Sequence, residues 1–82
     1  NAMKVRVTVM LKEGVLDPQG KAVEHALHVL DFKNVGEVRI GRVIELEVDE
    51  TDPVRARAQA DAMARALLAN LVIEDFTTEV VG

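Results

Sequence analysis

The sequence contains no cysteine, serine, tryptophan or tyrosine, and its only aromatic residues are Phe32 and Phe76. Without cysteine or serine, the chain has no disulfide and lacks the two commonest side-chain nucleophiles. None of its threonines stands at a spacing from a histidine that is typical of nucleophilic catalysis. Two aromatic rings offer little surface for base stacking, and the formal net charge of −4 does not attract a phosphate backbone. A nucleic-acid-binding function is therefore not expected.

Long apolar runs are also absent. No stretch reaches the roughly 18 residues needed to span a bilayer, and the beginning of the sequence does not resemble a secretory signal. Together with the missing cysteines, this favours a cytoplasmic protein without a membrane segment. Asn1 and Ala2 precede Met3 and resemble the remnant of a purification tag, so we expect a single domain over residues 3–82.

The apolar residues that are present are mostly small, since valine and alanine make up more than half of them. A core in a domain of this size rarely supplies more than about 3–5 kcal/mol, and small domains usually add disulfides, a metal or a partner chain. Cysteine is missing and there are only two histidines. We therefore expect this chain to oligomerise.

Two elements can be placed in the first half of the chain. Residues 4–12 alternate between apolar and polar side chains, which indicates a strand with one wet face. Asp17 and Pro18 then form a helix start, because aspartate is a good N-cap and proline is favoured at the first helical position. An apolar stripe follows at helical spacing, and Asn34 and Gly36 are suitable residues for ending the element. The stripe consists of Val23, Ala26, Leu27 and Leu30.

Residues 38–48 form a second strand region, with apolar side chains at the even positions and Arg42 interrupting them. A tight hairpin at Gly41 and Arg42 would place Val38 opposite Glu45, mixing charge into the apolar face. A long strand that bends or bulges at Gly41 fits the pattern better and can serve two sheet regions. The hairpin remains the alternative.

The second half repeats the first. Asp52 and Pro53 predict another helix start, and Asn70 is a plausible stop. The predicted buried face of this helix consists of Ala56, Ala60, Met63 and Leu67. Residues 72–81 read as a last strand. Two similar strand–helix–strand halves indicate an α+β ferredoxin-like sandwich, an antiparallel sheet with two helices on one face.

His25 and His28 are the only histidines, and an acidic cluster lies near the second helix start. At about 100° per residue, both histidines fall opposite the apolar stripe of the first helix, so we expect exposed side chains rather than metal ligands. The acidic cluster reads most simply as the wet face of a strand that runs into a helix cap. It consists of Glu45, Glu47, Asp49, Glu50 and Asp52.

Two segments have features that suggest a role in binding, and neither carries catalytic chemistry. Residues 16–20 combine a helix cap, a proline with a fixed φ and a flexible glycine, and residues 38–42 place two arginines beside the expected bend. Arg42 either extends to a sheet edge or reaches a carboxylate on another chain. As candidate protein-interface residues we select Asp17, Pro18, Gln19, Gly20, Arg39, Gly41 and Arg42. No catalytic, cofactor-binding or metal-binding residue is predicted.

These segments also carry a resemblance. The strand K-V-x-V-x-V-x-L-K (residues 4–12), the loop E-G-V-L-D-P-Q-G (13–20) and the strand V-x-x-V-R-I-G-R-V-I-E-L-E-V (35–48) follow one another in this order. In combination they resemble the PurS subunit family of phosphoribosylformylglycinamidine synthase, over essentially the whole chain from residue 3.

The resemblance implies a cytoplasmic subunit without catalytic residues. Proteins like PurS pair as dimers, with a dimer of dimers as a further possibility, and assemble with a synthetase subunit, small PurL, and a glutaminase subunit, PurQ. The complex uses ATP and Mg²⁺, glutamine and formylglycinamide ribonucleotide to make formylglycinamidine ribonucleotide in purine synthesis. The PurS-like chain itself would bind no cofactor, and would hold the two enzymes together while ammonia passes between them.

Two other classes of function remain open from the sequence. Ferredoxin-like α+β dimers often bind small effectors at their interface, so a ligand-sensing regulatory module is an alternative by fold analogy. A metal-dependent enzyme that uses His25, His28 and the acidic cluster is the second alternative.

Overall fold

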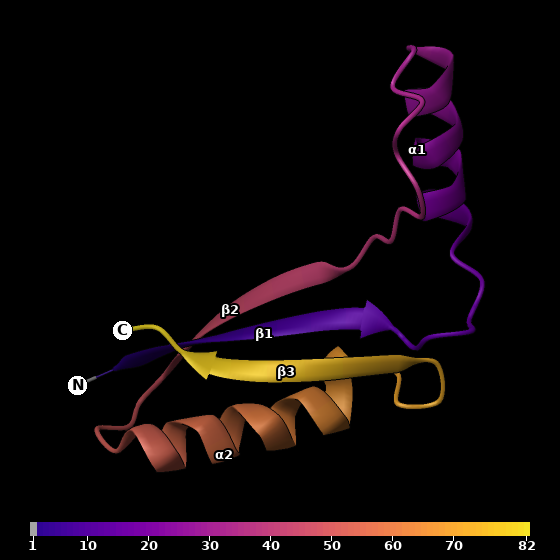
Figure 1. Ribbon diagram of the computed structural model, residues 1–82. Helices are drawn as coiled ribbons and strands as arrows, with labels where there is room; N and C mark the ends of the chain where they lie inside the picture. The colour runs from indigo at the N-terminus through magenta and orange to yellow at the C-terminus, as the bar shows by residue number, and fades with distance from the viewer. Residues whose placement is uncertain (1) are drawn as a thin grey trace.

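The computed structural model describes residues 2–82, and Asn1, the first residue of the predicted tag remnant, lies outside the described residues. In chain order the elements are β1 (Met3–Leu11), α1 (Pro18–Val29), β2 (Arg42–Val48), α2 (Pro53–Met63), the π-helix η1 (Ala64–Leu68) and β3 (Glu74–Val80). The strands form one antiparallel sheet in the order β2-β1-β3 (Figure 1). The element types and order agree with the sequence-based prediction of an α+β, ferredoxin-like chain.

The alternating pattern of β1 places its odd residues on the inner face of the sheet. Val5, Val7 and Val9 are fully buried at the centre of the molecule. Residues directly opposite one another in a sheet share a face. The inner face therefore also carries their partners on the two neighbouring strands, which are Arg42, Ile44, Leu46, Phe76, Thr78 and Val80.

Helix α2 covers this inner face through alanines. Ala56, Ala60 and Ala64 are fully buried, and their small side chains let the helix approach the valines of β1 closely. Met63 and Leu67, which the sequence pattern placed on the buried face, are instead 43% and 84% exposed. Leu67 lies in the π-helix that follows Met63, and the wider π-helical turn rotates it off the α-helical stripe. Met63 is the last residue of α2 and precedes this change, so its exposure has no such explanation.

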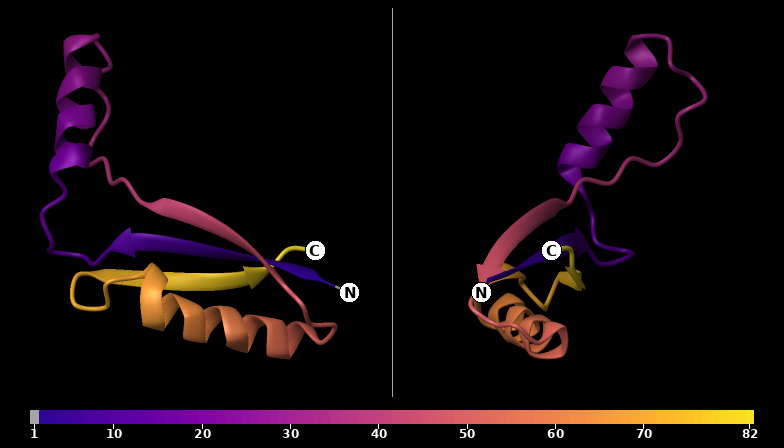
Figure 2. Two further views of the ribbon diagram at one scale, coloured as in Figure 1. Left: turned by 180° about the vertical axis from the view of Figure 1, so that it is seen from behind. Right: turned by 90° about the vertical axis from the view of Figure 1, so that its left-hand side faces the viewer.

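Helix α1 does not lie on the sheet of its own chain. It stands away from the end of the sheet, as Figures 1 and 2 show, and makes at most marginal contact with any strand or with α2. The radius of gyration is 16.1 Å, whereas a compact chain of this length would have about 12 Å. The predicted apolar stripe is correspondingly not buried: Val23 is 39% and Leu30 is 67% exposed.

The chain reverses soon after α1. The helix is capped at Leu30, and Asp31 adopts a left-handed conformation with a φ of 76°. The end predicted near Asn34 and Gly36 is therefore several residues too late. From Phe32 the chain returns along α1 to Gly41, and these residues are extended or turned but belong to no sheet.

Strand β2 begins at Arg42 rather than at residue 38 as predicted. Its pairing with β1 starts where Arg42 lies opposite Val9, and no strand within residues 2–82 pairs with residues 38–40. The alternative of a hairpin at Gly41 is also wrong, because β2 pairs with β1 and the chain passes Gly41 without turning back. The even-numbered residues of β2 do share one face, as the pattern predicted.

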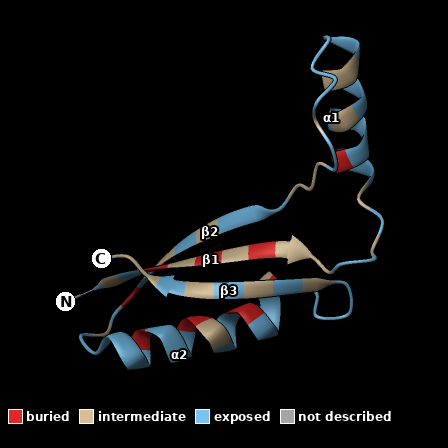
Figure 3. Cartoon of the chain, viewed as in Figure 1, coloured by how far each residue is buried: buried red, intermediate tan, exposed pale blue. Residues whose placement is uncertain are grey.

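The resulting core is small. Apart from Gly20 in the first turn of α1, every buried residue within residues 2–82 is a valine or an alanine. Ile44, Leu46 and Phe76 are only half-buried, and little of the sheet is coloured as buried in Figure 3. The accessible surface is 5756 Å², whereas a compact monomer of this mass would expose about 4,900 Å². The chain thus leaves roughly 900 Å² more uncovered than a compact domain would. None of the described helices is long and apolar enough to cross a membrane.

A candidate protein interface at the base of the arm

The two segments selected from the sequence meet in space. We call residues 15–40, which comprise α1 and the chain that returns from it, the arm. Residues 17–20 lie near the start of the arm, and residues 39–42 run from its end into the first residue of β2. Both segments lie where the arm joins the sheet (Figure 1). A cleft of about 290 Å³ lies at this base, and its lining includes Asp17, Pro18 and Gln19 from one segment and Ile40, Gly41 and Arg42 from the other.

Asp17 joins the two ends of the arm. Its Oδ1 accepts a hydrogen bond of 2.9 Å from the backbone N–H of Gly20, which makes it the predicted N-cap of α1. Its Oδ2 accepts a bond of 2.8 Å from the backbone N–H of Ile40. The Ile40 bond, then the Gly20 bond, and to a smaller extent the charge of Arg39 hold the pKa of the Asp17 carboxyl below its usual value. The carboxylate thus fixes the start of the helix to the end of the return segment.

Gly20 lies in the first turn of α1, although glycine is an unfavourable residue within a helix. It is buried, and a Cβ at this position would overlap the carbonyl oxygen of Val38 and lie 2.9 Å from Asp17 Oδ2. Glycine is therefore required because the return segment passes directly against the first turn of α1.

Arg39 and Gly41 attach the arm to the end of β1. The Arg39 guanidinium donates to the backbone carbonyls of Leu11 and Lys12. A Cβ at Gly41 would overlap the carbonyl oxygen of Val9 and the Sδ atom of Met10. These contacts leave the backbone at position 41 little room, so they fix the direction in which the chain leaves the arm and enters β2.

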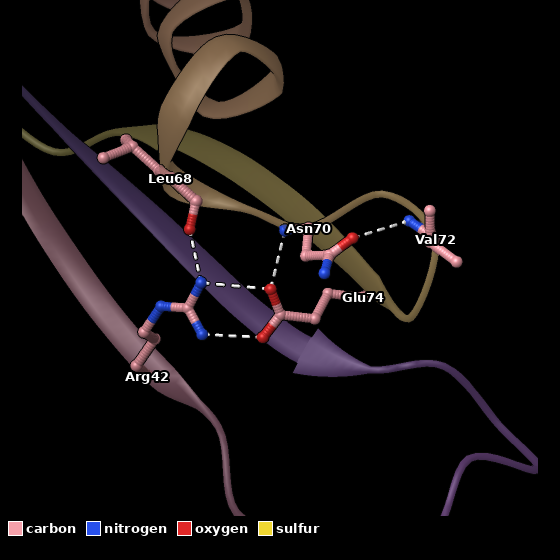
Figure 4. Close-up of polar contacts among 5 residues, drawn as sticks. All are labelled: Arg42, Leu68, Asn70, Val72 and Glu74. Atoms are coloured by element: carbon pink, nitrogen blue, oxygen red, sulfur yellow. Dashed lines mark hydrogen bonds and ion pairs between the residues drawn. The ribbon is translucent and has the colours of Figure 1, made fainter.

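Arg42 reaches a carboxylate of its own chain. Its guanidinium forms a bidentate pair with Glu74, with distances of 2.6 and 3.1 Å, and also donates to the carbonyl of Leu68 (Figure 4). The Arg42 bond, followed by a backbone N–H bond from Asn70, holds the pKa of Glu74 below its usual value. The side chain therefore crosses β1 on the inner face and closes one end of the core.

The histidines form no metal site. His25 is exposed as expected, but His28 is half-buried, and its Nε2 lies 2.8 Å from the carbonyl oxygen of Val35. The prediction of an exposed His28 failed because it assumed that α1 packs on the sheet, whereas α1 packs on its own return segment. Within residues 2–82, no three His, Cys, Asp or Glu side chains are arranged to hold a metal ion.

The exposed apolar surface of the arm was not among the candidate interface residues selected from the sequence. Beyond the two exposed stripe residues, Val29 is 70% and Phe32 is 53% exposed. The signal was present as the apolar stripe, but a stripe does not tell whether its partner lies in the same chain. Leu68 and Glu74, the partners of Arg42, were not singled out either.

Comparison with known proteins identifies the family. The model of the PurS family, described as phosphoribosylformylglycinamidine (FGAM) synthase, matches residues 4–82. The PurS subunit of this synthase from Bacillus subtilis is 49% identical over 77 residues, which cover 94% of this chain and 90% of that protein. The chain belongs to the PurS family. The corresponding subunit from Synechocystis is 44% identical over 75 residues, covering 92% of this chain and 75% of that protein.

Solved structures of PurS proteins share the fold. The PurS structure from Methanocaldococcus jannaschii has 35% sequence identity and a TM-score of 0.87, and the match covers 96% of this chain and 95% of that one. A chain in the structure of PurLQS from Thermotoga maritima has 26% identity and a TM-score of 0.89, covering 99% of both chains. The whole PurS-family chain, including the projecting arm, is thus similar to these structures.

Gly41 provides a test of the arm base. A Gly41→Ala substitution should destabilise this PurS-family chain by about 2 kcal/mol or more, because the added methyl group meets a backbone carbonyl that cannot move easily. Urea unfolding followed by circular dichroism at fixed protein concentration measures the effect. Gly36→Ala is the matched control, since a Cβ there has no neighbour within 4 Å. Equal stability of the two variants would contradict the close packing at Gly41.

The Arg42–Glu74 pair provides a test by pH. Because the pKa of Glu74 is lower in the folded chain than in the unfolded chain, its stabilising contribution is present above the ordinary glutamate pKa. That contribution is lost as the pH falls through the folded-state pKa. The stability difference between wild type and Glu74→Gln should therefore be largest near pH 7 and shrink in acid.

The unfolding free energy across this pH range measures the difference. Glu79→Gln, at an exposed position of the same strand, is the control. A wild-type advantage over Glu74→Gln that stays constant down to about pH 3 would contradict the pairing.

Proposed function

We propose that the chain is a non-catalytic assembly subunit of FGAM synthase. In this role it bridges the synthetase subunit, small PurL, and the glutaminase subunit, PurQ, and supports the passage of ammonia between them in purine synthesis. The observation that carries the proposal is the family match over residues 4–82. The likeness of the whole chain to one in the PurLQS structure supports the assembly role.

The chemistry of the described residues is consistent with this role. At the base of the arm, the side chains of Asp17, Arg39 and Arg42 hold backbone groups or a neighbouring carboxylate of the same chain. We propose that ATP and Mg²⁺ belong to the synthetase subunit and that this chain binds neither. The cytoplasm is the proposed location, which fits a chain without cysteine.

A ligand-sensing module is not favoured, because the relatives are named as synthase subunits.

Reconstitution tests the assembly role. Mixed synthetase and glutaminase subunits should lack glutamine-dependent FGAM formation until this chain is added, because only the assembled complex passes ammonia from one site to the other. Ammonia-dependent formation by the synthetase is measured in parallel as the control for an active synthetase. Full glutamine-dependent activity of the two enzymes without this chain would contradict the proposal.

We further propose that the subunit is a homodimer in which each arm lies on the sheet of the other chain. The first support is an uncovered half of the inner face. Helix α2 contacts β3 and β1 more extensively than β2, and Ile44 and Leu46 on β2 are only half-buried. A ferredoxin-like sheet carries two helices on this face, so there is room for a second one beside α2.

The second support is the arm itself. Helix α1 has the apolar stripe expected of a core helix, yet Val23 and Leu30 remain exposed in the single chain. Residues 38–40 belong to no helix or strand and have no sheet partner, while β2 is an edge strand whose outer side is open. In the proposed dimer α1 covers Ile44 and Leu46 of the second copy, and residues 38–40 become a fourth strand beside its β2.

The third support is the amount of surface. A standard interface buries about 800 Å² on each partner. The surface that this chain exposes beyond a compact monomer is roughly 900 Å². The excess therefore matches what one dimer contact would cover, with no need for a further copy.

Substitution of Val23 tests the dimer. Val23→Asp should weaken dimerisation at least about 100-fold, because each of the two equivalent contacts loses a buried apolar side chain worth about 1.5 kcal/mol or more. Analytical ultracentrifugation over a range of concentrations measures the dissociation constant. His25→Asp, at an exposed position of the same helix, is the matched control and should leave dimerisation nearly unchanged. Equal dissociation constants for the two variants would contradict the use of this stripe.

A further inference from the structure

The end of the second helix has an unusual hydrogen-bond register. Residues Ala64–Leu68 form a π-helix, and the backbone N–H of Ala69 donates to the carbonyl of Ala64 at 2.9 Å. π-Helices account for well under 1% of residues and occur often at functional sites. A return to the α-helical register would move this bond by one residue and rotate the following residues by about 100°. The alternative to the observed π-helical register is thus an α-helical register displaced by one residue.

One guanidinium holds this region in the π-helical arrangement. Arg42 donates to the carbonyl of Leu68, the last residue of the π-helix, and pairs with both oxygens of Glu74 at the start of β3. Glu74 Oε1 also accepts the backbone N–H of Asn70 at 2.7 Å. The Asn70 side chain in turn accepts the N–H of Val72 at 3.1 Å, as Figure 4 shows. Arg42 and Glu74 thus fix the π-helix, the turn and the strand start together.

The same arginine is attached to the arm. Arg42 directly follows Gly41, whose backbone is confined by Val9 and Met10, and Ile40, whose N–H is held by Asp17. A change in the direction of the arm must therefore move the backbone that carries Arg42. The guanidinium cannot keep its three contacts on the far side of β1 if that backbone shifts or rotates.

We propose that Arg42 couples the arm to the π-helical end of α2, so that the position of the arm selects the register of residues 64–74. The turn controlled in this way presents an apolar surface, since Leu67 is 84% and Val72 is 83% exposed. Binding of the arm to another chain would in this way change the surface around Leu67 and Val72 of the same subunit. The coupling runs within one chain and does not depend on the proposed role in FGAM synthase.

Amide hydrogen exchange of the full-length protein, followed residue by residue by NMR, tests the coupling. Asp17→Asn loosens the arm base, because the carboxamide keeps an acceptor for Gly20 but offers no second acceptor for Ile40. In the Asp17→Asn variant, the amide exchange rates of Ala69, Asn70 and Glu74 should rise about fivefold or more, which is the effect expected for the loss of one hydrogen bond. Exchange at Val7, in the central strand, should stay unchanged and shows that the sheet is intact.

A double-variant cycle separates coupling from general loosening. Arg42→Gln alone should raise exchange at the same three amides, and Asp17→Asn should then add no further increase. Arg65→Gln is the matched control, since Arg65 lies in the π-helix but contacts Asp61 and Phe76 rather than the arm. In that background the effect of Asp17→Asn should persist. The proposal is overturned if Asp17→Asn speeds exchange in the arm but not at residues 69–74, or if its effect remains undiminished in the Arg42→Gln background.

Discussion

The passage of the chain through Gly41 into β2 without turning back determines the architecture of this protein. In a self-contained sandwich the chain would turn back here, so that α1 and the strand after it lie on the sheet from which they came. Instead, the Asp17–Ile40 hydrogen bond and the tight packing of Gly41 against Val9 and Met10 send it directly from the arm into β2. The arm therefore cannot cover its own sheet. The exposed stripe of α1 and the half-covered β2 both follow from this one constraint.

Local chemistry made much of the fold predictable. The Asp17 and Asp52 caps define both helix starts, because their side chains accept backbone hydrogen bonds in the first turn. The alternation in β1 correctly indicated its inner face, and the parity of residues 42–48 indicated the face of β2. The selected segments 17–20 and 39–42 also proved to be neighbours in space. Their contacts with partner subunits remain a prediction.

Features that depend on tertiary context were not predictable. An apolar stripe such as that of Val23 and Leu30 indicates that the helix packs against another apolar surface. It does not indicate whether that surface belongs to the same chain or to a second one. The start of β2 at Arg42 depends on how far β1 extends beside it. The early reversal after α1 depends on the left-handed conformation of Asp31, a position where the sequence has no glycine to indicate a positive φ. The π-helix ends at Leu68, whose carbonyl accepts a hydrogen bond from the distant Arg42, and the run of alanines does not indicate that contact. For the start of β2 and for the end of the π-helix, the deciding contacts are distant in sequence. The reversal at Asp31 is instead closed by local bonds from Asp31 to His28 and from Phe32 to Leu27.

In the proposed dimer a second copy completes the fold of the first, and intermolecular nuclear Overhauser effects would detect the contacts between the two chains. A sample mixed from isotope-labelled and unlabelled chains is examined for contacts between methyl groups of different chains. The account predicts contacts from Val23 and Leu30 of one chain to Ile44 and Leu46 of the other. A dimer whose α1 methyl groups make no intermolecular contact, or a chain that stays monomeric at NMR concentrations, would contradict it.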